Sequence, residues 1–99
     1  MRYNYGAEIE KIKRRQQNFM IKLKNIEIEN GVLTCQIFPE DSEFAGNIKI
    51  DAVSNEIISF NLPLGYEWCK NHLEHARTYL IELYKSKNAI PQEKIIMWY

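Results

Sequence analysis

The dipeptide Asn30-Gly31 constrains the fold of this chain more than any other feature of the sequence. It stands between two segments of alternating apolar and polar residues, and both of its residue types tolerate the positive φ that a two-residue hairpin turn requires. Closing a hairpin on this turn puts apolar pairs on one face of the two strands: Ile28 with Leu33, and Ile26 with Cys35. The opposite face receives the polar pairs: Glu27 with Thr34, and Asn25 with Gln36. Turn chemistry and hydrophobic pattern thus predict the same register.

The strand before this turn changes phase once. Ile21 and Leu23 alternate with polar neighbours, but Ile26 and Ile28 continue the apolar series one residue out of step. A shift of one residue would turn the later side chains to the opposite face of the sheet. We therefore predict a β-bulge near Lys24–Asn25. The bulge would absorb the extra residue and keep Ile26 and Ile28 on the same apolar face as Ile21 and Leu23.

A second hairpin is predicted over residues 47–60, after a loop at residues 39–46. A three-residue connection at 53–55 suits this hairpin, since Asn55 fits the left-handed position of such a loop. Phe44, in the loop between the hairpins, is expected to pack back on the body of the protein. The predicted pairs of the second hairpin share one apolar face: Ile50 with Ile58, and Ile48 with Phe60.

One long helix is predicted over residues 66–87, where apolar residues recur every three or four positions. At 1.5 Å per residue it would be about 33 Å long, enough to cover a four-stranded sheet. Residues 94–99 are rich in β-branched and aromatic types and predict a C-terminal strand, either at an edge or beside the first strand. Residues 1–18 show a weak helical stripe and are interpreted as a short helix or an arm. The main stripe of the long helix comprises Tyr66, Cys69, Leu73, Ala76, Leu80, Leu83 and Tyr84.

These elements predict a single α+β domain over residues 1–99. Two β-hairpins at 19–60 would form an antiparallel meander, joined by the C-terminal strand and packed against the long helix. No run of about 18 apolar residues is present, so no membrane span is expected. The first residues lack the apolar segment of a secretory signal, and a cytoplasmic location is therefore the expectation.

Charge is balanced overall, with 13 basic and 13 acidic residues, but it is uneven along the chain. Residues 1–24 hold seven bases and two acids, residues 25–67 hold one base and eight acids, and residues 68–99 hold five bases and three acids. The net charges are therefore +5, −7 and +2. Zero net charge argues against general nucleic-acid binding, which goes with a strong basic excess. One alternative remains at the N-terminus, where a nucleic-acid accessory protein could use the basic patch Lys11, Lys13, Arg14 and Arg15.

Cys69, His72 and His75 are the residues most suited to chemistry. Residues three apart on a helix are neighbours, so Cys69 with His72, or His72 with His75, could share a ligand. The set falls short of the four ligands of a structural zinc site, and neither a metal nor a cofactor is expected. A Cys69 nucleophile with His72 as base is the enzymatic alternative, but a desolvated thiol on the core stripe is inert.

The preferred interpretation is a non-enzymatic protein that acts through contacts with a protein partner or a second copy of itself. The chain has more aromatic residues than a core of this size needs, and Tyr and Trp are enriched at interfaces. The competing interpretation is that the C-terminal strand and the N-terminal segment cover these residues within one molecule. The expected interaction surface is an exposed helix flank with the chain end: Trp68, His72, His75, Tyr79, Trp98 and Tyr99.

Overall fold

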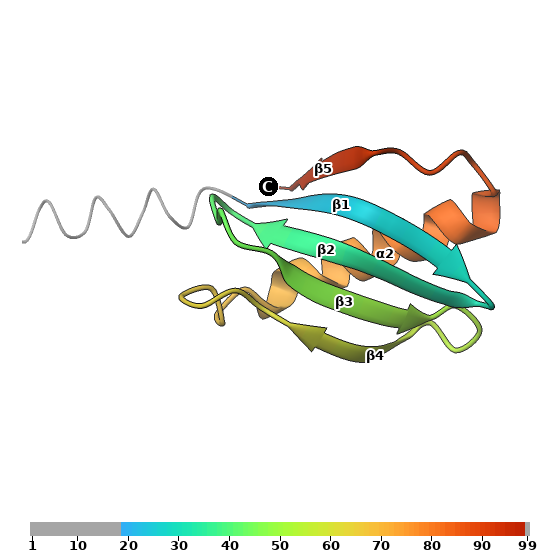
Figure 1. Cartoon of the computed structure of the whole chain (residues 1–99), viewed down its shortest axis with the longest axis horizontal. Helices are drawn as coiled ribbons and strands as arrows, with labels where there is room; N and C mark the ends of the chain where they lie inside the picture. Colours follow the sequence, from blue (N-terminus) through green and yellow to red (C-terminus); the bar gives the residue numbers. More distant parts are fainter. Residues whose placement is uncertain (1–18, 99) are drawn as a thin grey trace, which may run out of the picture.

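The computed structural model describes residues 19–98, which form one five-stranded antiparallel sheet and one helix. The strand order is β4-β3-β2-β1-β5, and α2 crosses a single face of the sheet (Figure 1). The predicted α+β fold is confirmed; the predictions for residues 1–18, including the basic patch, and for Tyr99 lie outside the described residues. The element bounds are β1 Met20–Glu29, β2 Val32–Pro39, β3 Gly46–Asp51, β4 Glu56–Asn61, α2 Lys70–Ser86 and β5 Glu93–Met97.

The first hairpin has the predicted turn and the predicted register next to it. Asn30 and Gly31 have φ of 53° and 77°, and Ile28 pairs with Leu33. The register shifts between Lys24 and Glu27, so the predicted bulge is confirmed. Asn25 takes a positive φ of 54° in the bulge.

One consequence of the bulge differs from the prediction. Gln36 pairs with Lys24 rather than with Asn25, because the extra residue lies on β1 alone. The side-chain amide of Asn25 still donates to Gln36 Oε1 at 2.5 Å. Ile26 and Cys35 are both buried in the core, as expected for the apolar face.

The second hairpin is partly as predicted. Ile48 pairs with Phe60, and Asn55 has a left-handed φ of 67°. Ile50, however, pairs with Ile57 and not with Ile58, because a second register shift follows Lys49. The register shift places one extra residue, Ile58, on β4. The alternation of apolar and polar residues in the sequence predicted the two strands but not this extra residue.

The prediction that Phe44 packs on the body is wrong, since its side chain is 76% exposed. Instead, polar groups of this loop form hydrogen bonds with one another. Ser42 Oγ donates to the carbonyl oxygen of Phe44 at 2.7 Å and accepts from the Phe44 amide at 3.2 Å. These local bonds fix the turn and leave the aromatic ring outside.

Helix α2 begins four residues later than the periodicity indicates. The Tyr66 amide donates to the Pro63 carbonyl, and the Cys69 amide donates to the Tyr66 carbonyl, so two successive turns precede the helix. At the other end Lys87 adopts a left-handed φ of 58°, and its amide donates to the Leu83 carbonyl at 3.1 Å. This is the usual way for a helix to satisfy one of its last carbonyls.

The core lies between α2 and the inner face of the sheet. Alternation along each strand sends every second side chain toward the helix, so the binary pattern of the sequence becomes a burial pattern. The core residues include Ile21, Leu23, Leu33, Ile37, Ile48 and Ile50 from the sheet, with Leu73, Ala76, Leu80 and Leu83 from the helix. Strand β5 pairs antiparallel with β1 and forms an edge of the sheet, as predicted.

Gly46 should tolerate a side chain less well than Gly31. A Cβ on Gly46 would lie 2.2 Å from the Asn61 carbonyl oxygen, whereas a Cβ on Gly31 meets nothing within 4 Å. Gly46→Ala is therefore expected to lower the free energy of unfolding by about 3 kcal/mol, measured by urea titration. Gly31→Ala should cost only the strain of its positive φ, about 1 kcal/mol. Equal losses for the two variants would show that β3 and β4 do not approach as described.

Candidate functional site

The helix flank predicted as an interaction surface is largely covered within the chain. His72 is 3% exposed, so the expectation that it lies on an exposed flank is wrong. His75, Tyr79 and Trp98 are half-buried, and Trp68 is 48% exposed. The Lys94 ammonium of β5 lies 5.4 Å from the centre of the Tyr79 ring.

Trp98 is the residue that closes this flank. Its ring stacks on His75 with a centroid separation of 3.8 Å and meets the edge of His72 at 4.9 Å. Its amide donates to the Phe19 carbonyl at 3.0 Å, which holds the end of the chain beside the start of β1. Trp68 contacts His72 from another side, with the ring centres 5.6 Å apart. The chain end thus covers His72 and His75, which agrees with the part of the competing interpretation that concerns the C-terminal segment; the N-terminal segment lies outside the described residues.

A buried pair between His72 and Glu40 lies beneath these aromatic rings. His72 Nε2 is 2.7 Å from Glu40 Oε2, and both side chains are almost fully buried. The same carboxylate oxygen accepts the Met20 amide at 3.1 Å. Carboxylate oxygens accept hydrogen bonds, so we assign the donor in this contact to Nε2 of His72. The pair therefore ties three elements together: the start of β1, the loop after β2 and the first turn of α2.

The backbone of Glu40 is held as tightly as its side chain. Glu40 has a φ of 55°, a conformation that costs a residue with a Cβ about 1–2 kcal/mol. Its amide donates to the Met20 carbonyl at 3.0 Å, which continues the ladder between β1 and β2. Glu40 was not predicted as a site residue from the sequence, because one acidic residue in an acidic loop carries no periodic signal.

The geometry of a catalytic thiol is not assembled at Cys69. His72 Nδ1 is buried and has no hydrogen-bond partner among the described residues, so the Cys69 thiol does not bond to it. Burial, and to a smaller extent the charge of Glu40, raises the pKa of Cys69 to about 12. Burial also raises the pKa of Cys35 to about 12. Both thiols therefore stay protonated at neutral pH and act as small apolar core residues.

The same residues do not form a metal site in the part of the chain that the structure describes. Across residues 19–98 no three His, Cys, Asp or Glu side chains are grouped so that they could hold an ion. Nε2 of His72 is already bonded to Glu40, and His75 lies flat against Trp98.

The face of the sheet away from α2 has no element over it among residues 19–98 (Figure 1). We call it the outer face. Strand register assigns its side chains, because they pair with one another and alternate with the buried series. One half of the outer face, the basic half, comprises Met20, Lys22, Lys24, Phe38, Glu93, Ile95 and Met97. The other half, the acidic half, comprises Glu27, Glu29, Val32, Thr34 and Asp51, with Lys49 as a base among these acids.

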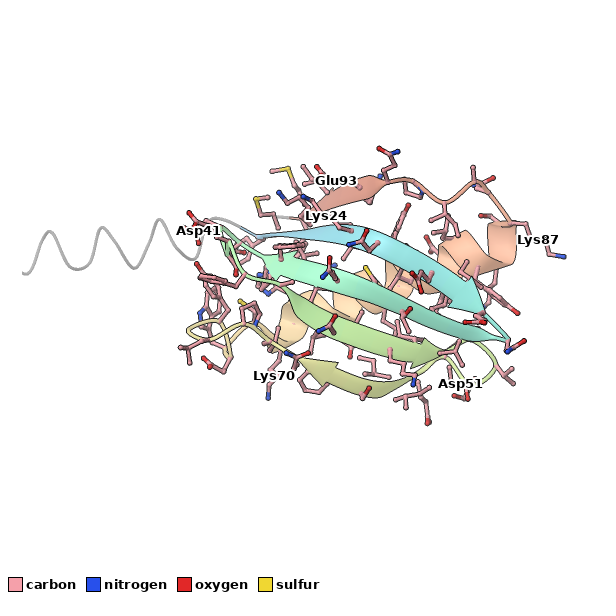
Figure 2. All side chains as sticks on the ribbon, in the orientation of Figure 1. Lys24, Asp41, Asp51, Lys70, Lys87 and Glu93 are labelled. Carbon is pink, nitrogen blue, oxygen red and sulfur yellow. The ribbon has the colours of Figure 1, made fainter. Side chains whose placement is uncertain are left out.

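The basic half is the more apolar of the two. Ile95 and Met97 are 47% and 59% exposed. The ammonium groups of Lys22 and Lys24 lie 5.7 and 5.5 Å from the centre of the Phe38 ring. Lys24 also faces Glu93 at 3.7 Å, and Figure 2 shows both side chains beside the β1–β5 edge. The sequence contained the signal for this surface, since net charge changes sign between Lys24 and Asn25, within β1.

Comparison of the chain with protein-family models, with curated proteins and with solved structures found no match. None of the helical structure in residues 19–98 has both the length and the apolar character needed to cross a bilayer. The geometry of the described residues therefore carries the functional argument.

Glu40→Ala should destabilise the fold more than its place in a loop suggests. The substitution leaves the Met20 amide and buried His72 Nε2 without their acceptor, at a cost of about 3 kcal/mol in the free energy of unfolding. Glu43→Ala, in the same loop but exposed, should change it by less than about 0.5 kcal/mol. Chemical denaturation of both variants measures the difference; a neutral Glu40→Ala would contradict a structural role for the pair.

Both thiols should resist alkylation while the protein is folded. With pKa values of about 12, only about one thiol in 10⁴ is ionised at pH 8. Iodoacetamide should therefore leave Cys35 and Cys69 unmodified in buffer and modify both in denaturant, as intact mass would show. Rapid and selective modification of Cys69 in the folded protein would instead support the enzymatic alternative.

Proposed function

We propose that this chain is a non-enzymatic protein that acts by binding another protein through the outer face of its sheet. The observation that carries the proposal is the pair Ile95 and Met97, each about half exposed on a sheet face that α2 leaves open, with Phe38 on the far side of β1. The proposal keeps the class of function inferred from the sequence and moves the surface from the helix flank to the sheet.

The composition of the outer face supports this use. Protein interfaces combine apolar, aromatic and methionine side chains at their centre with polar and charged side chains around them. Phe38 and Met97 supply the first kind, and Lys22, Lys24 and Glu93 supply the second within the same area. Aliphatic stems of lysine also cover apolar surface while the ammonium stays in water. The ammonium groups of such a face stay hydrated in the free protein, and they lose little of this hydration when a partner binds.

The remaining chemistry-bearing residues support a structural role rather than catalysis. Cys69 is buried with a raised pKa, and His72 is used to hold Glu40. A thiol nucleophile needs its base within hydrogen-bond reach, but His72 Nε2 is bonded to Glu40 and His72 Nδ1 has no partner among the described residues.

Site-specific photo-crosslinking in cells tests the proposal. A photoreactive amino acid replaces Met97 on the outer face or, as the matched control, Lys85 on the exposed side of α2. We expect one defined protein adduct from position 97, identified by mass spectrometry, that position 85 does not give. Equal or absent crosslinking at the two positions would contradict binding through the outer face, whatever the partner.

A further inference from the structure

We infer that the partner of the outer face is a second copy of this chain, packed sheet to sheet with its strands running in the opposite direction. This inference rests on the proposed function and names the partner of the same surface. It follows from the distribution of charge on the outer face, which is complementary to itself.

The charge of β1 is divided along its length. Lys22 and Lys24 point outward before the bulge, and Glu27 and Glu29 point outward after it. At about 3.3 Å per residue the centres of the two pairs lie about 17 Å apart. Asp51 on β3 pairs with Val32 and adds a third acid at the end where Glu29 lies; Figure 2 shows Asp51 near the turn that follows β3.

A two-fold axis in the plane of the interface, perpendicular to the strands, brings unlike halves together. It reverses the strand direction, so the basic half of one copy covers the acidic half of the other, and the same contact forms twice. Most dimers use such an isologous contact, in which one surface meets itself. Packing two sheets face to face with nearly aligned strands is also the usual way to cover an open face.

The acidic half has room for the lysines of the partner. A hollow of about 340 Å³ lies on it, lined by Glu27, Glu29, Asn30, Val32, Thr34 and Lys49. The hollow offers two carboxylates against the one ammonium of Lys49, and Val32 adds an apolar side chain, so its lining suits the charged end and the aliphatic stem of a lysine side chain.

The size of the face indicates how tight the dimer is. Five strands about 4.8 Å apart and about 20 Å long give a projected face of roughly 500 Å², before the relief of the side chains is counted. A standard interface buries about 800 Å² of accessible surface per partner. The face is smaller than the standard size, so we expect a weak, reversible dimer that forms in the micromolar range and weakens as salt screens the charges.

A nucleic acid fits this surface less well. Phe38 between two lysines is suited to stacking a base and contacting phosphate. The acidic half continues the same face, however, and would repel the phosphates that follow along a strand of nucleic acid. The second copy uses both halves of the face, and a nucleic acid uses only one.

Charge reversal tests the inference by sedimentation of the whole chain over the micromolar to millimolar range. Wild type should dimerise, and K22E/K24E and E27K/E29K should each be at least ten-fold weaker, because each places like charges in both contacts. An equimolar mixture of the two variants should regain dimers, since both contacts of the mixed dimer then unite opposite charges. Glu82→Lys/Lys85→Glu on the exposed side of α2 is the matched control and should dimerise like wild type.

Circular dichroism establishes that each variant is folded, and recovery in the mixture shows that neither lost association by unfolding. A monomeric wild type, or variants that dimerise as wild type does, would overturn the inference. Retention of wild type on heparin that K22E/K24E abolishes, without self-association, would overturn it in favour of a nucleic acid. A crosslinked partner other than this chain at Met97 would overturn the dimer while leaving the proposed function in place.

Discussion

The structure depends on keeping the apolar inner face of the sheet away from water, and one helix does this. Each strand contributes side chains such as Ile21, Leu33 and Ile48 to that face, and their burial is the main favourable contribution to folding. Because α2 can lie on only one side of the sheet, the opposite side stays open in the described part of the chain. The position of the helix thus determines which face of the sheet we propose for binding.

The Glu40–His72 pair fixes where that helix begins. No side chain caps the first turn of α2, and no acidic residue lies within it. Glu40 supplies a carboxylate beside this turn from a distant loop, where the positive end of the helix dipole favours a negative charge. It bonds Met20 as well, so the helix, the first strand and the β2–β3 loop are held by one side chain. Trp98 and Trp68 then exclude water from the pair by contacting the His72 ring.

The sequence predicted what local chemistry determines. Asn30-Gly31 and the phase change at Lys24 determine backbone conformation within a few residues, and the first hairpin and its bulge follow from them. The start of α2, the pairing of Ile50 and the exposure of Phe44 were not predicted, since they depend on turns and bulges that apolar periodicity does not record. His72 was misplaced for a different reason. Its burial comes from Glu40 and Trp98, which lie far from it along the chain, and a helical stripe cannot show which segments will cover it.

The change of charge sign at Lys24–Asn25 acquires its meaning only from the register. Along the chain it separates a basic segment from an acidic one, whereas in the sheet it divides one continuous outer face into two complementary halves.

The central claim is that this face, and not the helix flank, makes the protein contact. Methyl NMR spectra recorded over a range of protein concentrations test it most directly. We predict that the methyl signals of Met97, Ile95 and Met20 shift with concentration while that of exposed Leu64, in the loop before α2, does not. The claim would be contradicted if only signals of residues near Trp68 shifted. It would also be contradicted if the protein associated without any shift of the Met97, Ile95 and Met20 signals.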